Sequence, residues 1–414
     1  MAQVTELDKV TVAKSGDRPV SERVNTPVST KELERRWAAV RAAMDASKID
    51  VLLMQNNNDH MGGYVKYFTD VPAGNGYPFT VAFPKDDAMS VVNQGPFGLD
   101  VQLPPEGNWQ FRGVRRVLGT PSYASVDYSI DYDSELASKA LAPYAGATIG
   151  MVGRGTLPSS MLDFLRNKYP KAKFVNATDM VDQIKCVKSD EEIALARRTA
   201  AVQDAAIDAA MKAAVPGKKD IEIGALAEEV VLDLGGEQGI YLCSSYTPGS
   251  PSGHEPRHNQ QRVMRRGDLY TLLVETNGPG GYYTEISRTI VLGKATQEIK
   301  DEFAFVLEAR KYALSLVKPG ASCKDIWNSY NAFMRKNGRP EESRLFFHGQ
   351  GYDLVERPLV RVDEPMPIRK GMYFACHPTY MTKNLFATYC DDFLVTDNGV
   401  ERLHKYPEKL HELG

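Results

Sequence analysis

The sequence lacks the features that mark several classes of protein. It has five cysteines, an odd number, and none forms a C-x-x-C pair, so neither a disulfide framework nor a zinc ribbon is expected. No apolar run approaches the length of a membrane span, and residues 1–30 lack the apolar core of a signal peptide. These absences predict a cytoplasmic protein in a reducing compartment, with no membrane as partner.

An excess of charge of one sign is missing as well. Lys and Arg number 50 and Asp and Glu number 53, which gives a formal net charge of −3. A surface that binds nucleic acid would need clustered positive charge. The sequence also contains neither a P-loop nor a dinucleotide-binding glycine pattern. We therefore expect a small-molecule substrate and no nucleic acid as partner.

The chain has 414 residues, of which 43% are hydrophobic, as in a globular enzyme with two domains. Residues 1–28 are polar and irregular and are predicted to form an N-terminal arm. In residues 29–184, predicted strands such as 49–54 alternate with predicted helices, which indicates an α/β domain. Ser189 and Glu192 form a capping box at the start of a long helix. We place the start of the second domain, residues 185–414, at this junction.

The second domain contains a faint internal repeat. The order Glu-Ile, helix and Pro-Gly occurs with its motifs at 192–193 and 216–217, and again at 298–299 and 319–320. Each half would supply a pair of helices. The repeat therefore predicts pseudo-twofold symmetry in this domain.

Several segments near the C-terminus are framed by glycine or proline. They are Arg266-Gly267-Asp268, Gly281 to Thr289, Phe347 to Gly351, Glu356-Arg357-Pro358, Lys370-Gly371-Met372, Cys376-His377-Pro378 and Cys390 to Gly399. In this order and spacing they resemble the pita-bread (M24) family, which includes methionine aminopeptidases, aminopeptidase P, prolidase, creatinase and a dimethylsulfoniopropionate lyase. The resemblance implies an α+β fold, with a pita-bread catalytic domain after a smaller α/β domain.

The metal-ligand positions of this family hold different residues in this chain. Metallopeptidases of the family use two Asp, one His and two Glu, which suit divalent cations. The resemblance places Glu285 at the second Asp position and either Val274 or Glu275 at the first. The other three positions hold His348, His377 and Cys390, in that order. Because one position in five keeps its usual residue, we expect no ordinary two-metal aminopeptidase.

Two interpretations of the site follow from this substitution. In the first, which we favour because creatinase shows the same kind of loss, there is no metal and the histidines act as general acid and base. In the second, Glu285, His348 and His377 bind one divalent metal, iron or zinc, as a set of two His and one carboxylate. The resemblance also implies a catalytic histidine in residues 253–259, where His254 is preferred over His258.

The resemblance suggests substrate-binding residues outside this set. In creatinase a loop of the partner subunit reaches the active site, and the matching residues here are Asn75 and Tyr77. This implies a homodimer with the active site near the subunit border. The other candidate substrate-binding residues are Glu275, Arg357, Arg361 and Asp391.

Together these observations predict a creatinase-like hydrolase of a non-peptide C–N bond, such as an amide or amidine, in a small metabolite. It would work without metal. Two alternatives remain at this point: a mononuclear metal-dependent lyase or hydrolase, and a catalytically inert binding protein.

Overall fold

The computed structural model describes residues 28–413. The arm predicted for residues 1–28 therefore lies, apart from residue 28, outside the described residues. The described residues divide into two compact units, residues 28–58 with 64–178 and residues 59–63 with 179–413. Each unit has its own sheets and its own core, and each is described by itself below.

The first unit is built on one mixed sheet. Its strands are β1 Val51–Asn56, β2 Phe79–Pro84, β3 Met89–Gln94, β4 Asp100–Gln102, β5 Val114–Thr120, β6 Thr148–Met151 and β7 Lys173–Asn176. They are ordered β4-β5-β3-β2-β1-β6-β7. Its helices are α1 Thr30–Ser47, α2 Gly63–Thr69, α3 Ile130–Leu141 and α4 Ser159–Lys168, with the 3₁₀ helices η2 Asp127–Ser129 and η3 Ala142–Tyr144. Helix α1 begins after Ser29, whose side chain accepts a hydrogen bond from the Glu32 amide at 3.1 Å.

The second unit contains two larger sheets, in which most neighbouring strands are antiparallel, and two pairs of helices. Its helices are α5 Thr178–Lys185, α6 Asp190–Ala213, α7 Asp220–Asp233, α8 Gln297–Ser315 and α9 Cys323–Lys336, with the 3₁₀ helix η4 Arg257–Asn259. Its strands are β8 Gly239–Tyr246, β9 Leu269–Asn277, β10 Tyr283–Val291, β11 Phe347–Gly349, β12 Glu356–Leu359, β13 Tyr373–Cys376, β14 Thr379–Met381, β15 Phe386–Thr388, β16 Asp391–Thr396, β17 Gly399–Arg402 and β18 His411–Glu412. One of the larger sheets has the order β18-β10-β9-β8 and the other β12-β11-β13-β16-β17, while β14 and β15 form a separate two-stranded sheet.

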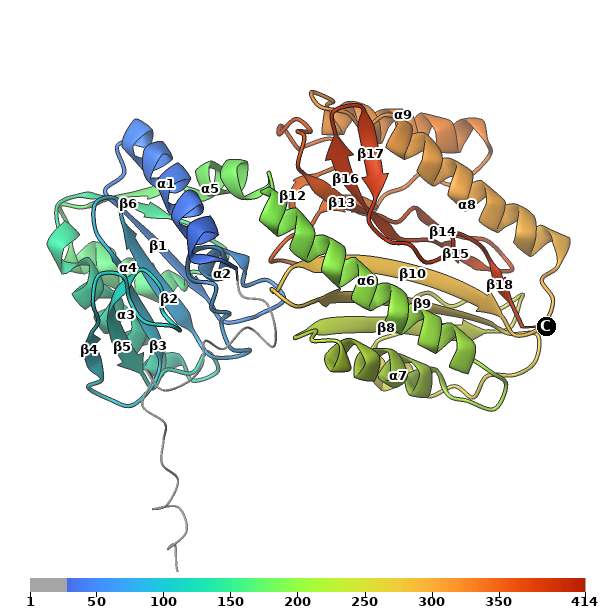
Figure 1. The fold of residues 1–414 in the computed structure, drawn as a ribbon, viewed down its shortest axis with the longest axis horizontal. Helices are drawn as coiled ribbons and strands as arrows, with labels where there is room; N and C mark the ends of the chain where they lie inside the picture. The colour runs from blue at the N-terminus through green and yellow to red at the C-terminus, as the bar shows by residue number, and fades with distance from the viewer. Residues whose placement is uncertain (1–27, 414) are drawn as a thin grey trace, which may run out of the picture. The chain divides into compact units, whose positions relative to one another are not determined.

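Each helix pair covers one of these sheets. Helix α6 packs on α7 and on strands β9 and β10, and α8 packs on α9 (Figure 1). Apolar side chains of α6, α7 and β8–β10 form one core, and those of α8, α9 and β11–β16 form another. The predicted capping box at Ser189 and Glu192 starts α6. The predicted α+β class and the pseudo-twofold arrangement of the second unit are confirmed.

The two sheets of the second unit meet where β10 passes the start of β16. The Ser287 amide donates to the carbonyl of Cys390 at 3.2 Å, and the Glu285 amide donates to Oδ2 of Asp392 at 3.1 Å. Every residue of β10 is buried. Polar side chains at this junction are therefore removed from bulk water and face residues of the other sheet.

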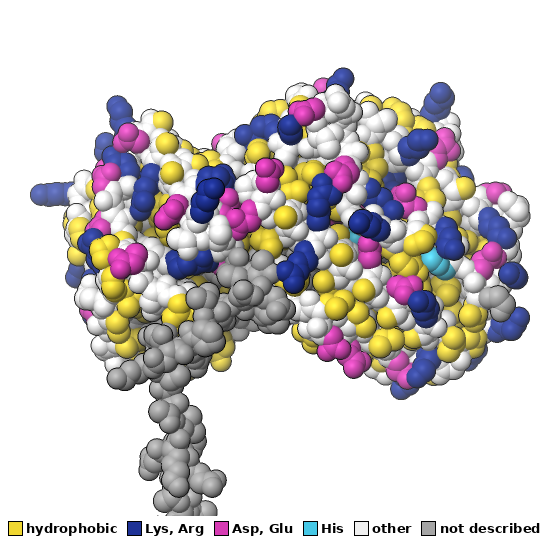
Figure 2. All heavy atoms as spheres, viewed as in Figure 1, with side chains coloured by type: hydrophobic (Ala, Val, Ile, Leu, Met, Phe, Trp, Pro, Cys, Tyr) yellow, Lys and Arg dark blue, Asp and Glu magenta, His cyan; other side chains and the backbone are white. Residues whose placement is uncertain are grey.

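None of the described helices is both long and apolar enough to cross a membrane. On the face drawn in Figure 2, positive and negative side chains are interspersed. The cytoplasmic location stays a prediction.

Candidate functional site

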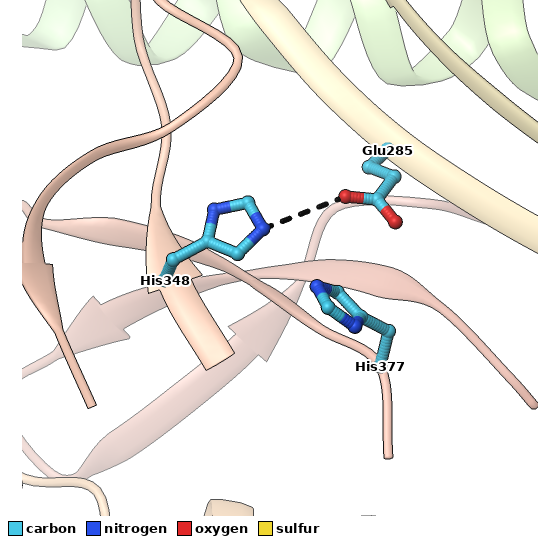
Figure 3. A group of neighbouring side chains, drawn as sticks. All are labelled: Glu285, His348 and His377. Atoms are coloured by element: carbon cyan, nitrogen blue, oxygen red, sulfur yellow. Dashed lines mark ion pairs between the residues drawn. The ribbon is translucent and has the colours of Figure 1, made fainter. Parts of the chain in front are cut away.

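Three strands of the second unit bring Glu285, His348 and His377 together. Glu285 lies on β10, His348 on β11, and His377 directly follows β13. One potential ligand atom from each side chain lies within 4.8 Å of the others. His348 Nε2 is 3.7 Å from a carboxylate oxygen of Glu285, and the two imidazole rings are 5.1 Å apart between centroids. Figure 3 shows the three side chains converging on one point.

The orientation of His348 is fixed by a backbone carbonyl. Its Nδ1 lies 3.1 Å from the carbonyl oxygen of Gly349, which can only accept a hydrogen bond, so Nδ1 carries the proton. The lone pair of Nε2 then faces Glu285, as in a metal-binding histidine whose other nitrogen is held by a carbonyl. A bulkier residue at Gly349 is excluded because an added Cβ would meet the carbonyl oxygens of Glu356 and Arg357 at about 3 Å.

Burial keeps the site histidines neutral. It lowers the pKa of His348 to about 4. Burial also lowers the pKa of His377 well below its usual value, and the charges of His348 and Arg344 add to this effect. Neutral imidazoles are good metal ligands, but they would not titrate near neutral pH. The general acid–base role expected for these two histidines is therefore not supported by their environment.

Two further carboxylates lie close to Glu285. The register of β9 and β10 pairs Glu275 with Glu285, so both side chains point to the same face of the sheet. Burial raises the pKa of Glu285 to about 7. Burial and the negative charge of Glu285 also raise the pKa values of Glu275 and Asp392. The site is thus rich in buried acceptor oxygens.

Gln350 and Asp392 were missed by sequence reasoning. Gln350 Nε2 donates to Glu275 Oε1 at 2.8 Å, and Asp392 accepts from the backbone of Glu285. The available signals were weak: Gln350 lies inside the glycine-framed segment that carries His348, and Asp392 is two residues after Cys390, on the same side of the strand.

The donor set suits one divalent cation. Two imidazole nitrogens and one carboxylate are ligands for zinc or non-heme iron. Cys390, at another family ligand position, directs its thiol to the carbonyl of Glu285 at 3.5 Å. Burial raises the pKa of this thiol well above its usual value, and the thiol is engaged with that carbonyl. The residues therefore fit one cation better than two.

The structure separates the two histidines of residues 253–259. The ring of His254 packs edge-on against Phe386 at 5.0 Å, and burial lowers its pKa to about 4. A charge on His254 would also lower the pKa of His377, so the two imidazoles interact electrostatically. His258 lies on η4 with an exposed side chain. Of the two, His254 is the one brought to the site.

Asp391 faces away from the site. Its carboxylate is bound by Arg288 at 2.7 Å, Arg310 at 2.5 Å and Arg402 at 2.9 Å. Burial raises its pKa, but the arginines outweigh this effect and hold the pKa well below its usual range. The predicted role of Asp391 in substrate binding is therefore replaced by a structural one, because strand alternation turns Asp391 and Asp392 to opposite faces.

We expect Asp391→Asn to destabilise the protein by about 3–5 kcal/mol, because it leaves buried arginine charges without a partner. Chemical denaturation measures this change. Asp363→Asn, which alters an exposed pair with Arg361, is the matched control and should change stability by no more than about 0.5 kcal/mol. Unchanged stability together with a raised KM would return Asp391 to substrate binding.

Glu285, His348 and His377 are called the three-residue group below. The remaining candidate substrate-binding residues lie outside it. Arg357 binds Glu364 at 2.6 Å and Asp179 at 2.5 Å, and Arg361 is paired with Asp363 on the surface. These ion pairs explain both arginines without a substrate. Asn75 and Tyr77 are exposed in the first unit, and their role stays a prediction.

Comparisons with known proteins relate the second unit to a family of peptidases. Residues 194–397 match the model of metallopeptidase family M24. The Xaa-Pro dipeptidase of Pyrococcus horikoshii is 27% identical over 261 residues, which cover 62% of this chain and 73% of the relative. A hydrolase/peptidase of Sinorhizobium fredii, y4tL, described as uncharacterized, is 27% identical over 396 residues and covers 92% of this chain and 96% of the relative.

Solved structures show the same fold. The X-Pro aminopeptidase of Thermotoga maritima superposes with a TM-score of 0.76 at 19% identity, covering 91% of this chain and 99% of that one. The dipeptidase PepE of Mycobacterium ulcerans gives a TM-score of 0.74 at 20% identity, covering 94% and 99%. At these identities the likeness establishes the pita-bread fold alone.

These comparisons correct the predicted function. The prediction of a metal-independent, creatinase-like hydrolase of non-peptide C–N bonds in small-molecule catabolism is wrong, since the named relatives are Xaa-Pro dipeptidases and the family is one of metallopeptidases. The chain also resembles dipeptidases and aminopeptidase P rather than creatinase or the lyase. The prediction took the substituted ligand positions as a sign that the metal site was lost. The fold instead brings together a different set of potential ligands, Glu285, His348 and His377. The family implies a divalent metal, and Glu285, His348 and His377 are candidate ligands for it.

Proposed function

We propose that this chain, whose residues 194–397 form an M24-family domain, is a metal-dependent peptidase of small substrates such as dipeptides. It would hold one divalent cation, zinc or iron, with Glu285, His348 and His377. The observation that carries the proposal is the convergence of these three side chains within 4.8 Å. The names of the relatives support a peptide bond as the target.

The residues around the cation position have distinct tasks in this proposal. A bound divalent cation polarises a substrate carbonyl and makes a water more acidic. His348 contributes the lone pair of Nε2, because the carbonyl of Gly349 holds the proton on Nδ1. Glu275, kept in place by the 2.8 Å hydrogen bond from Gln350, takes up the proton that the attacking water releases.

His254 would interact with the leaving group of the substrate in this proposal. In the described part of the chain, its Nε2 has no hydrogen-bond partner although it is buried. A buried imidazole nitrogen without a partner costs free energy, which a substrate group would offset by binding there. We assign to His254 a hydrogen bond to the leaving nitrogen of the scissile peptide bond.

A dipeptide assay tests the proposal. Protein loaded with zinc, or with iron under anaerobic conditions, should release amino acids from at least one Xaa-Pro dipeptide, detected by mass spectrometry. Loss of electrostatic stabilisation by the cation should slow this hydrolysis by at least about 100-fold in the metal-free protein. Turnover of amidines or ureides without hydrolysis of any dipeptide would contradict a peptidase.

The predicted homodimer also belongs to this proposal. Tyr77 is 46% exposed and its ring meets that of Tyr123 at 6.1 Å, so an aromatic surface is available in the first unit. We expect sedimentation equilibrium to give a dimer at micromolar concentration, and Tyr77→Ala to raise KM while leaving the dimer intact. An active monomer at that concentration would exclude a site completed by a second subunit.

A further inference from the structure

Two buried oxygen atoms beside the cation position have no hydrogen-bond donor. They are Oδ1 of Asp392 and Oε1 of Gln350, and both side chains are fully buried. Within residues 28–413, neither atom accepts a hydrogen bond. Unpaired buried acceptors are rare because each costs free energy, so a donor from outside the chain is expected.

The orientation of Gln350 is well determined by its neighbours. Its Nε2 donates to Glu275 Oε1 at 2.8 Å and to the carbonyl of Leu354 at 3.0 Å. Exchanging the amide oxygen and nitrogen would break both bonds. Oε1 is therefore a hydrogen-bond acceptor next to Glu275. Because it belongs to an amide, its missing donor points to a ligand independently of the acidic side chains.

Asp392 faces the same region from the sheet that carries His348. Strands β11, β13 and β16 align His348, Ala375 and Asp392 in one row, so His348 and Asp392 lie on the same face with a small residue between them. Oδ2 of Asp392 is occupied by the Glu285 amide. Its Oδ1 is left for a ligand.

The acidic residues here also lack a positive partner. In the described part of the chain, neither Glu275 nor Asp392 has a Lys or Arg within the 4.0 Å limit of an ion pair. By contrast, Asp391 on the opposite face is bound by three arginines. Buried carboxylates without a counter-charge favour a ligand that is positively charged.

A bare metal ion does not fit this second position. Among the described residues, only Glu285, His348 and His377 form a group of three potential ligands within 4.8 Å. Glu275 and Asp392 do not complete a second group of this kind with a third side chain. A cation that carries several N–H groups reaches such acceptors, since each charge-assisted hydrogen bond adds about 2.8 Å.

We propose that Asp392 and Gln350, next to Glu275, form a subsite beside the cation position that binds an ammonium or guanidinium group of the substrate. The subsite rests on the proposed function for the identity of its natural ligand, a peptide. The shared chemistry is a positive charge with more than one N–H donor, which either the N-terminal amine or a basic side chain would supply.

Calorimetric titration of small probes tests the subsite without requiring turnover. Methylguanidinium is compared with its neutral analogue methylurea, and ethylammonium with ethanol, in zinc-loaded and in metal-free protein. We expect at least one cation to bind with a Kd of about 1 mM, and neither neutral analogue to bind measurably. The tighter of the two cations identifies the group that the subsite accepts.

Two variants connect this binding to the named atoms. Asp392→Asn keeps an oxygen that accepts from the Glu285 amide but removes the negative charge. Gln350→Leu removes Oε1, the buried oxygen that has no hydrogen-bond donor. Each should weaken cation binding by about tenfold or more, since hydrogen bonds to charged groups are strong. Asp220→Asn, a buried carboxylate that binds Ser245, is the matched control and should bind the probes as the wild type does.

The outcomes separate this inference from the proposed function. Equal binding of charged and neutral probes by the wild type, no cation binding, or unchanged affinity in both variants would overturn the subsite, even if dipeptides are hydrolysed. Selective cation binding in a protein that hydrolyses no peptide would support the subsite and remove the peptidase. If Asp392→Asn does not fold, the subsite is tested by Gln350→Leu. It is also tested by comparing charged with neutral probes on the wild type.

Discussion

Removal of the divalent cation should abolish peptide hydrolysis, and return of one equivalent of zinc or iron per chain should restore it. Glu285, His348 and His377 are the described group able to hold a metal ion, and the Cys390 thiol is engaged elsewhere. Activity is measured after treatment with a chelator and during titration with metal, and the metal content is measured by elemental analysis.

The stoichiometry is the discriminating result. One ion per chain at full activity is expected. Two ions per chain, with activity rising until the second is bound, would mean that Glu275 and Asp392 serve as metal ligands. Full activity after complete removal of metal would contradict the proposed role of the three-residue group.

His348→Ala should lose both the cation and turnover. The imidazole is 3% exposed, and its Nε2 points at Glu285 rather than into an apolar core. Loss of one ligand or electrostatic group at such a site lowers the rate by roughly 10²–10⁴-fold. Steady-state kinetics, metal content and the melting temperature are measured together.

The matched control for this variant is His258→Ala, since His258 is an exposed histidine of the same unit. It should retain near-normal turnover and metal content. Partial recovery of His348→Ala by added imidazole would show that the missing ring is the cause. A variant that keeps its metal and its rate, or that only melts earlier, would make His348 a packing residue.

Much of the fold could be predicted because local rules repeat along the sequence. Ser189 and Glu192 predict the start of α6, and the structure shows both hydrogen bonds of the capping box. The framed segments place Glu285, His348 and His377 in the right elements because each lies at a fixed distance from a glycine, proline or arginine.

The rest depends on which face a side chain occupies. Asp391 and Asp392 are adjacent in sequence, yet the first meets three arginines and the second meets Glu285. A register error of one residue exchanges these surroundings, and no local pattern fixes it. Gln350 was missed for a related reason, since its partner Glu275 is 75 positions away in the chain.

The meeting of β10 with β16 also has a thermodynamic consequence. Glu285 belongs to the first half of the pita-bread domain, whereas His348 and His377 belong to the second. A cation held by all three would cross-link the halves, and the unfolded chain would not hold these ligands together. Cation binding and domain folding are then linked equilibria. A free cation concentration of 100 times its Kd would stabilise the folded state by about 2.7 kcal/mol, so the cation supply would set the folded fraction of the protein as well as any activity of the site.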